Sequence, residues 1–454
     1  MSDPLEDARL RRVRTDWRVG RLKHFARLTG GGTPAKENVE YWEGGNIPWV
    51  SPKDMKRRVI TETGDYITEA AVDGSATSFV EAGSPLMVVR SGILRHTLPV
   101  AIAGVRLTLN QDMKAFKLKR ELNSNFFAYW IEGQSSDLLL EWRQFGATVE
   151  SIDIDRMMNG RIAVPDLCTQ RNIVDFLDRE TAHIDKLIEK KQRLVALWDE
   201  RTNADLSQIV FQSCTALGDL IESGVDWLGR IPSSWQLSRI GWELQRITYG
   251  FTNPMPTVDE GPFLLTANDV NYGRIIWETA RRTSQQAYDH DLTDKSRPKK
   301  GDVLLTKDGT LGRVAIHDGR PACINQSVAL LRPRRNRLTS DFLANVLLSR
   351  RYQDRMVFEA GGTTIKHIYI TRLQKMPFPV PSIEEQCQIN RCVDAQRQRA
   401  QGLGEMINAS IERLRELRAA LITAAVTGQI DLATWGKQGQ TDRRLDQIEE
   451  AMRA

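Results

Sequence analysis

The side chains that most often perform catalysis are few and scattered in this sequence. Its six histidines are His24, His96, His183, His290, His317 and His367. None of them stands at a spacing typical of metal ligands or of a catalytic triad. The phosphate-binding pattern Gly-x-x-x-x-Gly-Lys and the dinucleotide-binding pattern Gly-x-Gly-x-x-Gly are both missing from the sequence. We therefore predict a chain with no catalytic residues, no metal site and no cofactor of its own.

One short segment is similar to a catalytic motif. Thr252-Asn253-Pro254-Met255 resembles the Asn-Pro-Pro-aromatic motif of amino methyltransferases, which act on a base flipped out of the duplex. The segment lacks the second proline and the aromatic residue, and no glycine-rich cofactor loop lies at a suitable position. Nuclease-like Asp…Glu-x-Lys spacing has no convincing instance either. The sequence therefore favours a recognition protein over an enzyme.

The five cysteines are Cys168, Cys214, Cys323, Cys387 and Cys392. An odd and scattered set predicts reduced thiols in the cytosol and not a disulfide framework. Cys387 and Cys392 are five positions apart in a predicted helix, with no histidine near them in sequence. We expect ordinary buried or surface thiols at all five positions.

Amide, hydroxyl and basic side chains are the remaining candidates for functional residues. They lie in a sequence that contains an internal duplication. Residues 145–165 and 361–381 align without gaps at an offset of 216 (364 − 148). Seven of the 21 positions are identical: Gly146/Gly362, Thr148/Thr364, Ile152/Ile368, Ile154/Ile370, Arg156/Arg372, Val164/Val380 and Pro165/Pro381. The same offset also relates Gln170/Gln386, Ile173/Ile389 and Asp178/Asp394. The period is too long for a solenoid, so it predicts two domain-sized copies and a pseudo-two-fold axis.

Each copy begins with a mixed segment and ends with a helical one. Residues 301–319 read as a β-hairpin with a turn at Asp308-Gly309, and the matching segment begins at Gly83 and turns near Ser91-Gly92. Residues 169–211 and 382–428 carry apolar side chains at helical spacing, and Ser382 with Glu385 offers a capping box. Helices of roughly 60 Å exceed a globular domain, so we expect them to pack together as an antiparallel coiled coil.

The composition is that of a folded chain with a mild positive charge. Apolar residues make up 41%, the net charge is +5 and the pI is about 8.9. Basic residues crowd the first 23 positions and the segment 281–300, which we interpret mainly as solvated faces. No run approaches the ~20 apolar residues that span a bilayer, and the start has no apolar signal-peptide region. We expect a soluble cytoplasmic protein without a membrane partner.

The chain resembles the specificity subunit of Type I restriction–modification systems over about residues 17–430. Residues 224–235 (GVDWLGRIPSSW) are similar to the family's signature at the start of a target-recognition domain. The segment GDVLLTKDGTLGR (301–313), followed by Ile324-Asn325-Gln326, is similar to that domain's recurring core. GGTTIKHIYITRLQKMPFPVPSIEEQ (361–386) is similar to its closing segment.

This resemblance implies a non-catalytic subunit that recognises double-stranded DNA. Each target-recognition domain would recognise one half of a bipartite, asymmetric site. The helical pair would set the spacing and dock two methylation subunits, which flip and methylate adenine. Two restriction subunits would join them where the system also cleaves DNA. S-adenosylmethionine, ATP and Mg would belong to these partner subunits and not to this chain.

The predicted fold class is α+β, with two tandem-duplicated mixed α/β target-recognition domains separated by two long helices. The predicted domains are target-recognition domain 1 (1–166), spacer helix 1 (167–213), target-recognition domain 2 (214–381), spacer helix 2 (382–430) and a polar tail (431–454).

We expect DNA contacts from loops of the mixed domains, where amide and basic groups can recognise base edges and hydroxyl groups can hold phosphates. In the first copy the candidates are Thr33, Ser51, Lys53, Asp54, Arg90, Ser91, Arg95, Asn110 and Gln111. In the second copy they are Thr266, Asn268, Asp269, Lys307, Asp308, Thr310, Arg313, Asn325, Gln326 and Lys366.

Several alternatives stay open. Asp308 and both Asn-Gln pairs also suit purely structural hydrogen bonds, and Trp42, Trp49 and Trp277 suit core packing better than base stacking. The chain as a whole is also compatible with a coiled-coil scaffold between protein partners that has no DNA role. A single-chain DNA methyltransferase is the third possibility, and S-adenosylmethionine bound to the isolated chain would favour it.

Overall fold

The computed structural model describes residues 4–144, 149–214, 219–361 and 366–430. The chain divides into two compact units: unit 1 comprises residues 1–192 and 409–454, and unit 2 comprises residues 193–408. The predicted tail (431–454) and the matched positions Gly146, Thr148, Gly362 and Thr364 lie outside the described residues. The predicted domain boundaries stay a prediction, because each unit combines a sheet-rich part with segments of both long helices.

Within the described residues, the sheet-rich part of unit 1 is built from short strands, five short α-helices and several 3₁₀-helices. Its helices are α1 (Pro4–Leu10), α2 (Glu69–Asp73), α3 (Ser124–Gly133), α4 (Ser135–Trp142) and α5 (Ile154–Asn159). Its strands are β1 (Arg18–Arg21), β2 (Ala26–Gly30), β3 (Ile47–Val50), β4 (Val59–Ile60), β5 (Asp65–Ile67), β6 (Pro85–Val88), β7 (Val100–Ala103), β8 (Thr108–Leu109), β9 (Met113–Leu118) and β10 (Arg161–Val164). They form a five-stranded sheet in the order β2-β9-β6-β7-β4, a three-stranded sheet β5-β3-β8 and the ribbon β1-β10.

The core of unit 1 forms where α3 packs against the larger sheet. Residues 126–131 of α3 are all buried, as are all four residues of β6. Aromatic rings fill the space between them, with Phe116 against Phe127 at 4.9 Å and Phe127 stacked on Trp130 at 6.0 Å. Asn123 caps α3 by accepting hydrogen bonds from two backbone N–H groups of its first turn. A helix as apolar as α3 is stable only when its apolar side chains are buried against other elements, here the larger sheet.

Unit 2 repeats this arrangement with more strands. Its short helices are α7 (Ile240–Glu243), α8 (Ser340–Leu348), α9 (Arg350–Glu359) and α10 (Ile370–Leu373). Its strands are β11 (Leu220–Glu222), β12 (Arg230–Pro232), β13 (Gln236–Arg239), β14 (Leu244–Tyr249), β15 (Val258–Leu265), β16 (Val270–Asn271), β17 (Arg274–Ile275), β18 (Arg281–Arg282), β19 (Val303–Thr306), β20 (Val314–Ile316), β21 (Ala322–Ile324), β22 (Val328–Pro333) and β23 (Pro377–Val380). The main sheet has the order β14-β22-β19-β20, beside a three-stranded sheet β18-β15-β21 and the ribbon β13-β23.

The strand pairing confirms the duplication. In unit 1 the ribbon pairs Arg18 with Val164, and in unit 2 it pairs Gln236 with Val380. The antiparallel pair β19–β20 confirms the predicted hairpin of 301–319, but residues 307–313 connect the strands in place of the predicted tight turn at Asp308-Gly309. Its counterpart β6–β7 is also antiparallel, but the predicted turn near Ser91-Gly92 is wrong. Ser91 instead caps a short 3₁₀-helix at Gly92–Arg95 by accepting from the N–H of Ile93, so the connection is longer than a tight turn.

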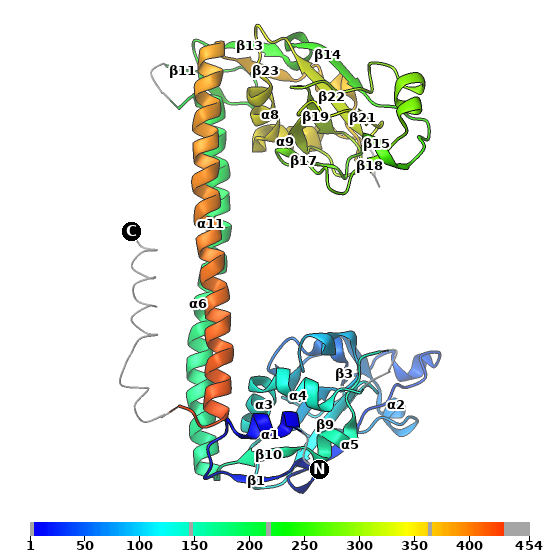
Figure 1. The fold of residues 1–454 in the computed structure, drawn as a ribbon, viewed down its shortest axis with the longest axis vertical. Helices are drawn as coiled ribbons and strands as arrows, with labels where there is room; N and C mark the ends of the chain where they lie inside the picture. Colours follow the sequence, from blue (N-terminus) through cyan, green and yellow to red (C-terminus); the bar gives the residue numbers. More distant parts are fainter. Residues whose placement is uncertain (1–3, 145–148, 215–218, 362–365, 431–454) are drawn as a thin grey trace. The chain divides into compact units, whose positions relative to one another are not determined.

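The two predicted long helices are confirmed as α6 (Leu167–Gln212) and α11 (Ile383–Val426), which run antiparallel (Figure 1). In unit 1, Arg418 of α11 donates to Asp185 of α6 and to Glu132 at the end of α3. In unit 2, Gln396 donates to Asp205. No helix within the described ranges is long and apolar enough to cross a membrane.

The predicted capping box at the start of α11 is only half present. The Ser382 hydroxyl accepts from the N–H of Glu385, as expected. The Glu385 carboxylate does not return to Ser382 and accepts from the indole N–H of the buried Trp235 at 3.0 Å. Tertiary packing thus takes the carboxylate that the local motif would have used, and it ties α11 to the β13 end of the domain.

A buried glutamine joins each long helix to its own domain. The Gln170 amide donates to the carbonyls of Pro165 and Glu121 and accepts from the N–H of Asn123. Gln386 makes the same set with Pro381, Arg337 and Thr339. Both side chains are fully buried. This explains why the sequence match Gln170/Gln386 extends beyond the closing segment.

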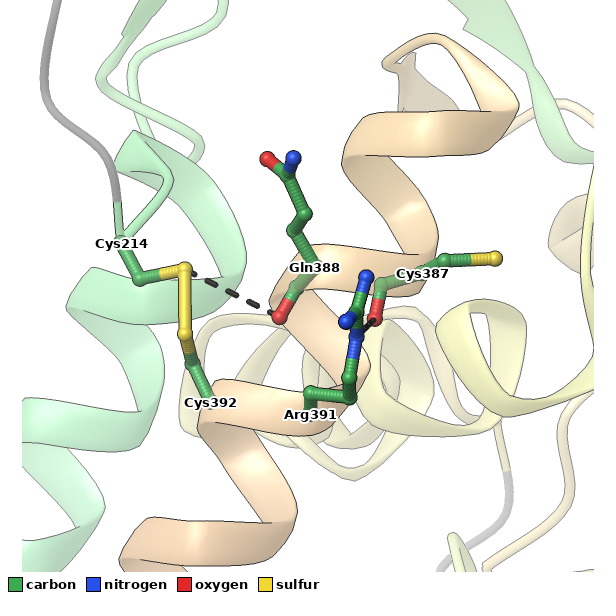
Figure 2. The surroundings of a disulfide bond; sticks show 5 residues. All are labelled: Cys214, Cys387, Gln388, Arg391 and Cys392. Carbon is green, nitrogen blue, oxygen red and sulfur yellow. Dashed lines mark hydrogen bonds between the residues drawn. A yellow bond between two sulfur atoms is a disulfide. The ribbon is translucent and has the colours of Figure 1, made fainter.

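The expectation of five free thiols is wrong for one pair. Cys214, just after α6, and Cys392 on α11 form a disulfide with their Cα atoms 6.5 Å apart (Figure 2). The two residues are 178 positions apart, so only the antiparallel pairing of the helices reveals their proximity. Cys168, Cys323 and Cys387 are free, and Figure 2 shows Cys387 pointing away from the bond.

Candidate nucleic-acid interface

The predicted contact residues gather where strands end. In unit 1, β3 and β8 are parallel neighbours with Val50 opposite Leu109, so Ser51 and Asn110 leave the sheet at the same edge. In unit 2, β15 and β21 are parallel with Leu265 opposite Ile324, which places Thr266 and Asn325 at the corresponding edge. A backbone hydrogen bond joins the two loops in each unit, from Asn110 to Val50 and from Asn325 to Leu265.

The first loop is a hydroxyl–carboxylate turn in both units. Asp54 accepts from the backbone N–H and the hydroxyl of Ser51, both at 2.8 Å. Asp269 accepts from the same two groups of Thr266, both at 2.7 Å. These carboxylates fix the shape of the loop. In unit 2, Asn268 lies between Thr266 and Asp269 in sequence, and its side chain makes no hydrogen bond within the described part of the chain.

The second loop is held by an asparagine. Asn110 accepts from the N–H of Asp112, and Asn325 accepts from the N–H and the hydroxyl of Ser327. A glycine passes against this loop in each unit: a Cβ on Gly31 would lie 2.0 Å from the Asn110 carbonyl oxygen, and one on Gly250 would lie 1.7 Å from that of Ile324. Both asparagines therefore have a structural role.

The glutamines beside these asparagines differ between the units. The Gln111 amide oxygen accepts from the Thr33 hydroxyl in unit 1. The Gln326 side chain makes no hydrogen bond to another described residue, so its amide is available for a ligand. The two loops share a backbone shape but present different polar groups.

Four predicted cations are already paired with carboxylates. The pairs are Lys53–Asp65 (2.7 Å), Arg90–Asp112 (2.6 Å), Arg95–Glu150 (3.3 Å) and Lys307–Asp308 (2.9 Å). The hydrogen bond that Lys53 donates to the Asp65 carboxylate raises the pKa of Lys53, so this ammonium stays charged. Lys307 is buried, whereas the other three cations remain exposed to solvent. Pairing fixes the orientation of these groups and lowers their net attraction for phosphate.

Arg313, unlike the four paired cations, has no carboxylate partner among the described residues. Its Nε is buried and has no hydrogen-bond partner among the described residues, and its guanidinium forms no ion pair with them. Its backbone N–H is held by the Thr306 hydroxyl, which itself donates to the Thr310 carbonyl. The β19–β20 loop thus presents Arg313 from a fixed backbone. Lys366 is exposed, and its side chain likewise makes no hydrogen bond within the ranges the structure covers.

His367 is a site residue that the sequence interpretation missed. Its Nδ1 bonds to the carboxylate of Asp308, and the two residues also form a backbone bridge. The ring of Tyr369 packs edge-on against it at 4.5 Å. The only available signal was its place in the duplicated segment, where offset 216 sets it against Ser151.

Other predicted features belong to the structural frame. Trp49 is buried against Trp42 at 5.2 Å, and Trp277 packs against Phe263 at 4.8 Å, which confirms core packing for these rings.

In the first basic run, Arg9 is not part of a solvated face, because it is buried and ion-paired with Glu141 at 2.7 Å. In the second run, Arg297 donates to three backbone carbonyls. A hollow of about 1190 Å³ in unit 1 contains none of the predicted contact residues.

Comparison with known proteins gives a consistent family. A family model described as the Type I restriction modification DNA specificity domain matches residues 14–196 and 255–413. The EcoR124I/EcoR124II specificity subunit of Escherichia coli is 38% identical over 182 residues, which are 40% of this chain and 45% of that protein. The MjaVIII specificity subunit of Methanocaldococcus jannaschii is 20% identical over 92% of this chain and 94% of its own length.

Solved structures share the fold. A structure titled as the basis of complex assembly and conformational transition of the type I R-M system aligns with 92% of this chain and 99% of its own, with a TM-score of 0.68 and 16% identity. The HsdS subunit from Thermoanaerobacter tengcongensis aligns with 92% of this chain and 98% of its own, with a TM-score of 0.52 and 16% identity.

Proposed function

We infer the function from one premise, that this chain belongs to the Type I restriction modification DNA specificity family. We propose that it is the DNA-recognition subunit of a Type I restriction–modification complex and that it carries no catalytic residues itself. Each unit recognises one half of a bipartite DNA site.

One observation carries this proposal beyond the family match. Both units bring the same three loops together through backbone hydrogen bonds, after β3, β8 and β6 in unit 1 and after β15, β21 and β19 in unit 2. The backbone bonds repeat, while the side chains differ in charge and in hydrogen-bonding groups. Two equivalent scaffolds with different polar groups suit two different half-sites, so the target is not a palindrome.

The partners and cofactors follow from this role. Double-stranded DNA and two methylation subunits bind this chain, and two restriction subunits join where the complex cleaves DNA. S-adenosylmethionine serves the methylation subunits, and ATP with Mg serves the restriction subunits, all in the cytoplasm. The paired helices α6 and α11 set the gap between the half-sites and dock the methylation subunits. With ~3.4 Å per base-pair step, helices of this length allow a separation of at most roughly 20 base pairs.

Sequencing that detects modified bases tests the proposal directly. The chain is produced in cells together with its cognate methylation subunit, and the DNA is compared with that of cells carrying an inactive methylation subunit. Methyladenine at a two-part, non-palindromic motif with a fixed gap is the expected result. If a correctly assembled complex produces no new modified motif, the DNA-recognition role is rejected and a plain scaffold remains.

A further inference from the structure

The loop that follows β6 in unit 1 and the loop that follows β19 in unit 2 are anchored by the same pattern of backbone hydrogen bonds. In unit 1, Val89 donates its N–H to the carbonyl of Asp112 and accepts from the N–H of Ile152, both at 2.8 Å. In unit 2, Lys307 donates to Ser327 at 2.9 Å and accepts from Ile368 at 3.0 Å. The residue that follows is bridged to the closing segment in both units. Arg90 pairs there with Ser151, and Asp308 pairs with His367.

These bonds make Arg90 and Asp308 structurally equivalent. They are separated by 218 positions (308 − 90), whereas their bridge partners Ser151 and His367 keep the offset of 216 (367 − 151). Gap-free sequence alignment would place Gly92 opposite Asp308 and hide the relationship. At one position of the scaffold, the charge is therefore inverted between the units.

Neighbouring groups hold both charges in place. Arg90 is fixed by Asp112, on the loop held by Asn110. Asp308 is held from two sides, by Lys307 at one carboxylate oxygen and by Nδ1 of His367 at the other. A carboxylate oxygen accepts more than one hydrogen bond, and the Asp308 side chain keeps 26% of its surface exposed. Both groups can meet a ligand without losing their partners.

We propose, resting on the proposed function, that positions 90 and 308 are equivalent specificity-determining positions, with Arg90 recognising guanine in one half-site and Asp308 recognising cytosine in the other. An arginine fork matches the two acceptors, O6 and N7, of guanine in the major groove. A carboxylate only accepts, and cytosine is the base whose major-groove edge offers an amino donor without an adjacent acceptor. His367 is a positioning residue that aims the Asp308 carboxylate.

Three substitutions test the assignment in the assembled complex by mapping methyladenine motifs. Asp308→Asn keeps the shape but adds an amide donor, so the requirement for cytosine relaxes toward adenine by about 10-fold at one base pair. His367→Ser installs the residue of unit 1 and relaxes the same base pair. Arg90→Gln relaxes a guanine in the other half-site. The matched control is Asp354→Asn, an exposed acid of α9 in unit 2, which leaves the motif unchanged.

Each result decides the proposal. It holds if each substitution relaxes a single G·C pair in its own half-site while the other half-site stays intact. It is overturned if the substitutions leave both half-sites unchanged while the unsubstituted chain methylates a two-part motif, and the proposed function then still stands. It is also overturned if the affected position is an A·T pair. Loss of all methylation with Asp308→Asn leaves the decision to Arg90→Gln, which acts in the other unit. If the unsubstituted chain gives no motif, the proposed function fails first.

Discussion

Arg313 shows what a single side chain can contribute at this surface. Its guanidinium has no carboxylate partner in the described parts of the chain, while the cations at positions 53, 90, 95 and 307 all have one. An unpaired guanidinium held by a fixed loop loses little protein interaction when it binds a base or phosphate. The sequence predicted it as one of nineteen candidate contacts, and the structure separates it from the four paired cations.

Arg313→Ala is expected to weaken specific DNA binding by ~1–3 kcal/mol if the side chain contacts a guanine. Fluorescence anisotropy with the assembled complex measures this on the cognate duplex and on one with the unit 2 half-site replaced. A phosphate contact would weaken both duplexes alike and reduce the salt dependence. Arg350→Ala, an exposed arginine of α9, is the control. Unchanged affinity and unchanged target preference would remove Arg313 from the interface.

His367 and Asp308 mark the limit of prediction at the residue scale. Asp308 was expected as a candidate contact and, alternatively, as a plain turn residue. Its partner could not be named, because residues 59 positions apart meet only when the closing segment bridges the hairpin loop. Gly31 and Gly250 are similar cases. Each must be glycine because a Cβ there would collide with a backbone carbonyl at the end of a strand that is distant in sequence.

At the scale of elements, the junction between domain and helix depends on one buried amide. Gln386 satisfies two carbonyls and one N–H that come from the β23 end, from the loop before α8 and from the N-cap of α8. A leucine there would leave all three backbone groups without partners. Buried unsatisfied groups of this kind are costly because they lose water and gain nothing.

Gln386→Leu is therefore expected to destabilise unit 2 by on the order of 2–4 kcal/mol. Hydrogen exchange measured by mass spectrometry reports it as faster exchange at residues 337–342 and in the first turns of α11. The peptides around Gln170 in unit 1 serve as an internal reference. Gln388→Leu, an exposed glutamine on the same helix, should leave exchange unchanged. Equal protection in both variants would show that the buried amide is dispensable.

At the scale of the whole chain, a disulfide joins two residues that the sequence did not predict to be bonded. The Cys214–Cys392 disulfide connects the end of α6 to α11 and encloses 178 positions of sequence. In unit 1 the positions at offset 216 are Ile430 and Phe176; Phe176 belongs to the apolar core, and the partly buried Ile430 packs against that core. Apolar side chains thus occupy in unit 1 the two positions that the disulfide takes in unit 2.

Under oxidising conditions the bond should stabilise unit 2, typically by about 2–4 kcal/mol, because it restricts the unfolded chain. Reductant or Cys214→Ser is expected to lower the unfolding temperature of unit 2. Cys387→Ser, on the same helix, should not. Alkylation of the denatured, unreduced protein should label Cys168, Cys323 and Cys387. Labelling of all five cysteines in protein purified without reductant would contradict the disulfide.

Local sequence patterns are enough to predict the architecture: the duplication, the two long helices and the hairpin of 301–319. These features depend on the spacing of residues within an element and on the period of the duplication, and both can be recognised in short stretches of sequence. Tertiary structure decided which loops meet, which cations are neutralised and which residue of one unit corresponds to which of the other. Parallel pairing of β3 with β8 and of β15 with β21 joins segments about 60 residues apart, and no local pattern encodes that contact. The charge inversion between Arg90 and Asp308 becomes visible only on that shared backbone.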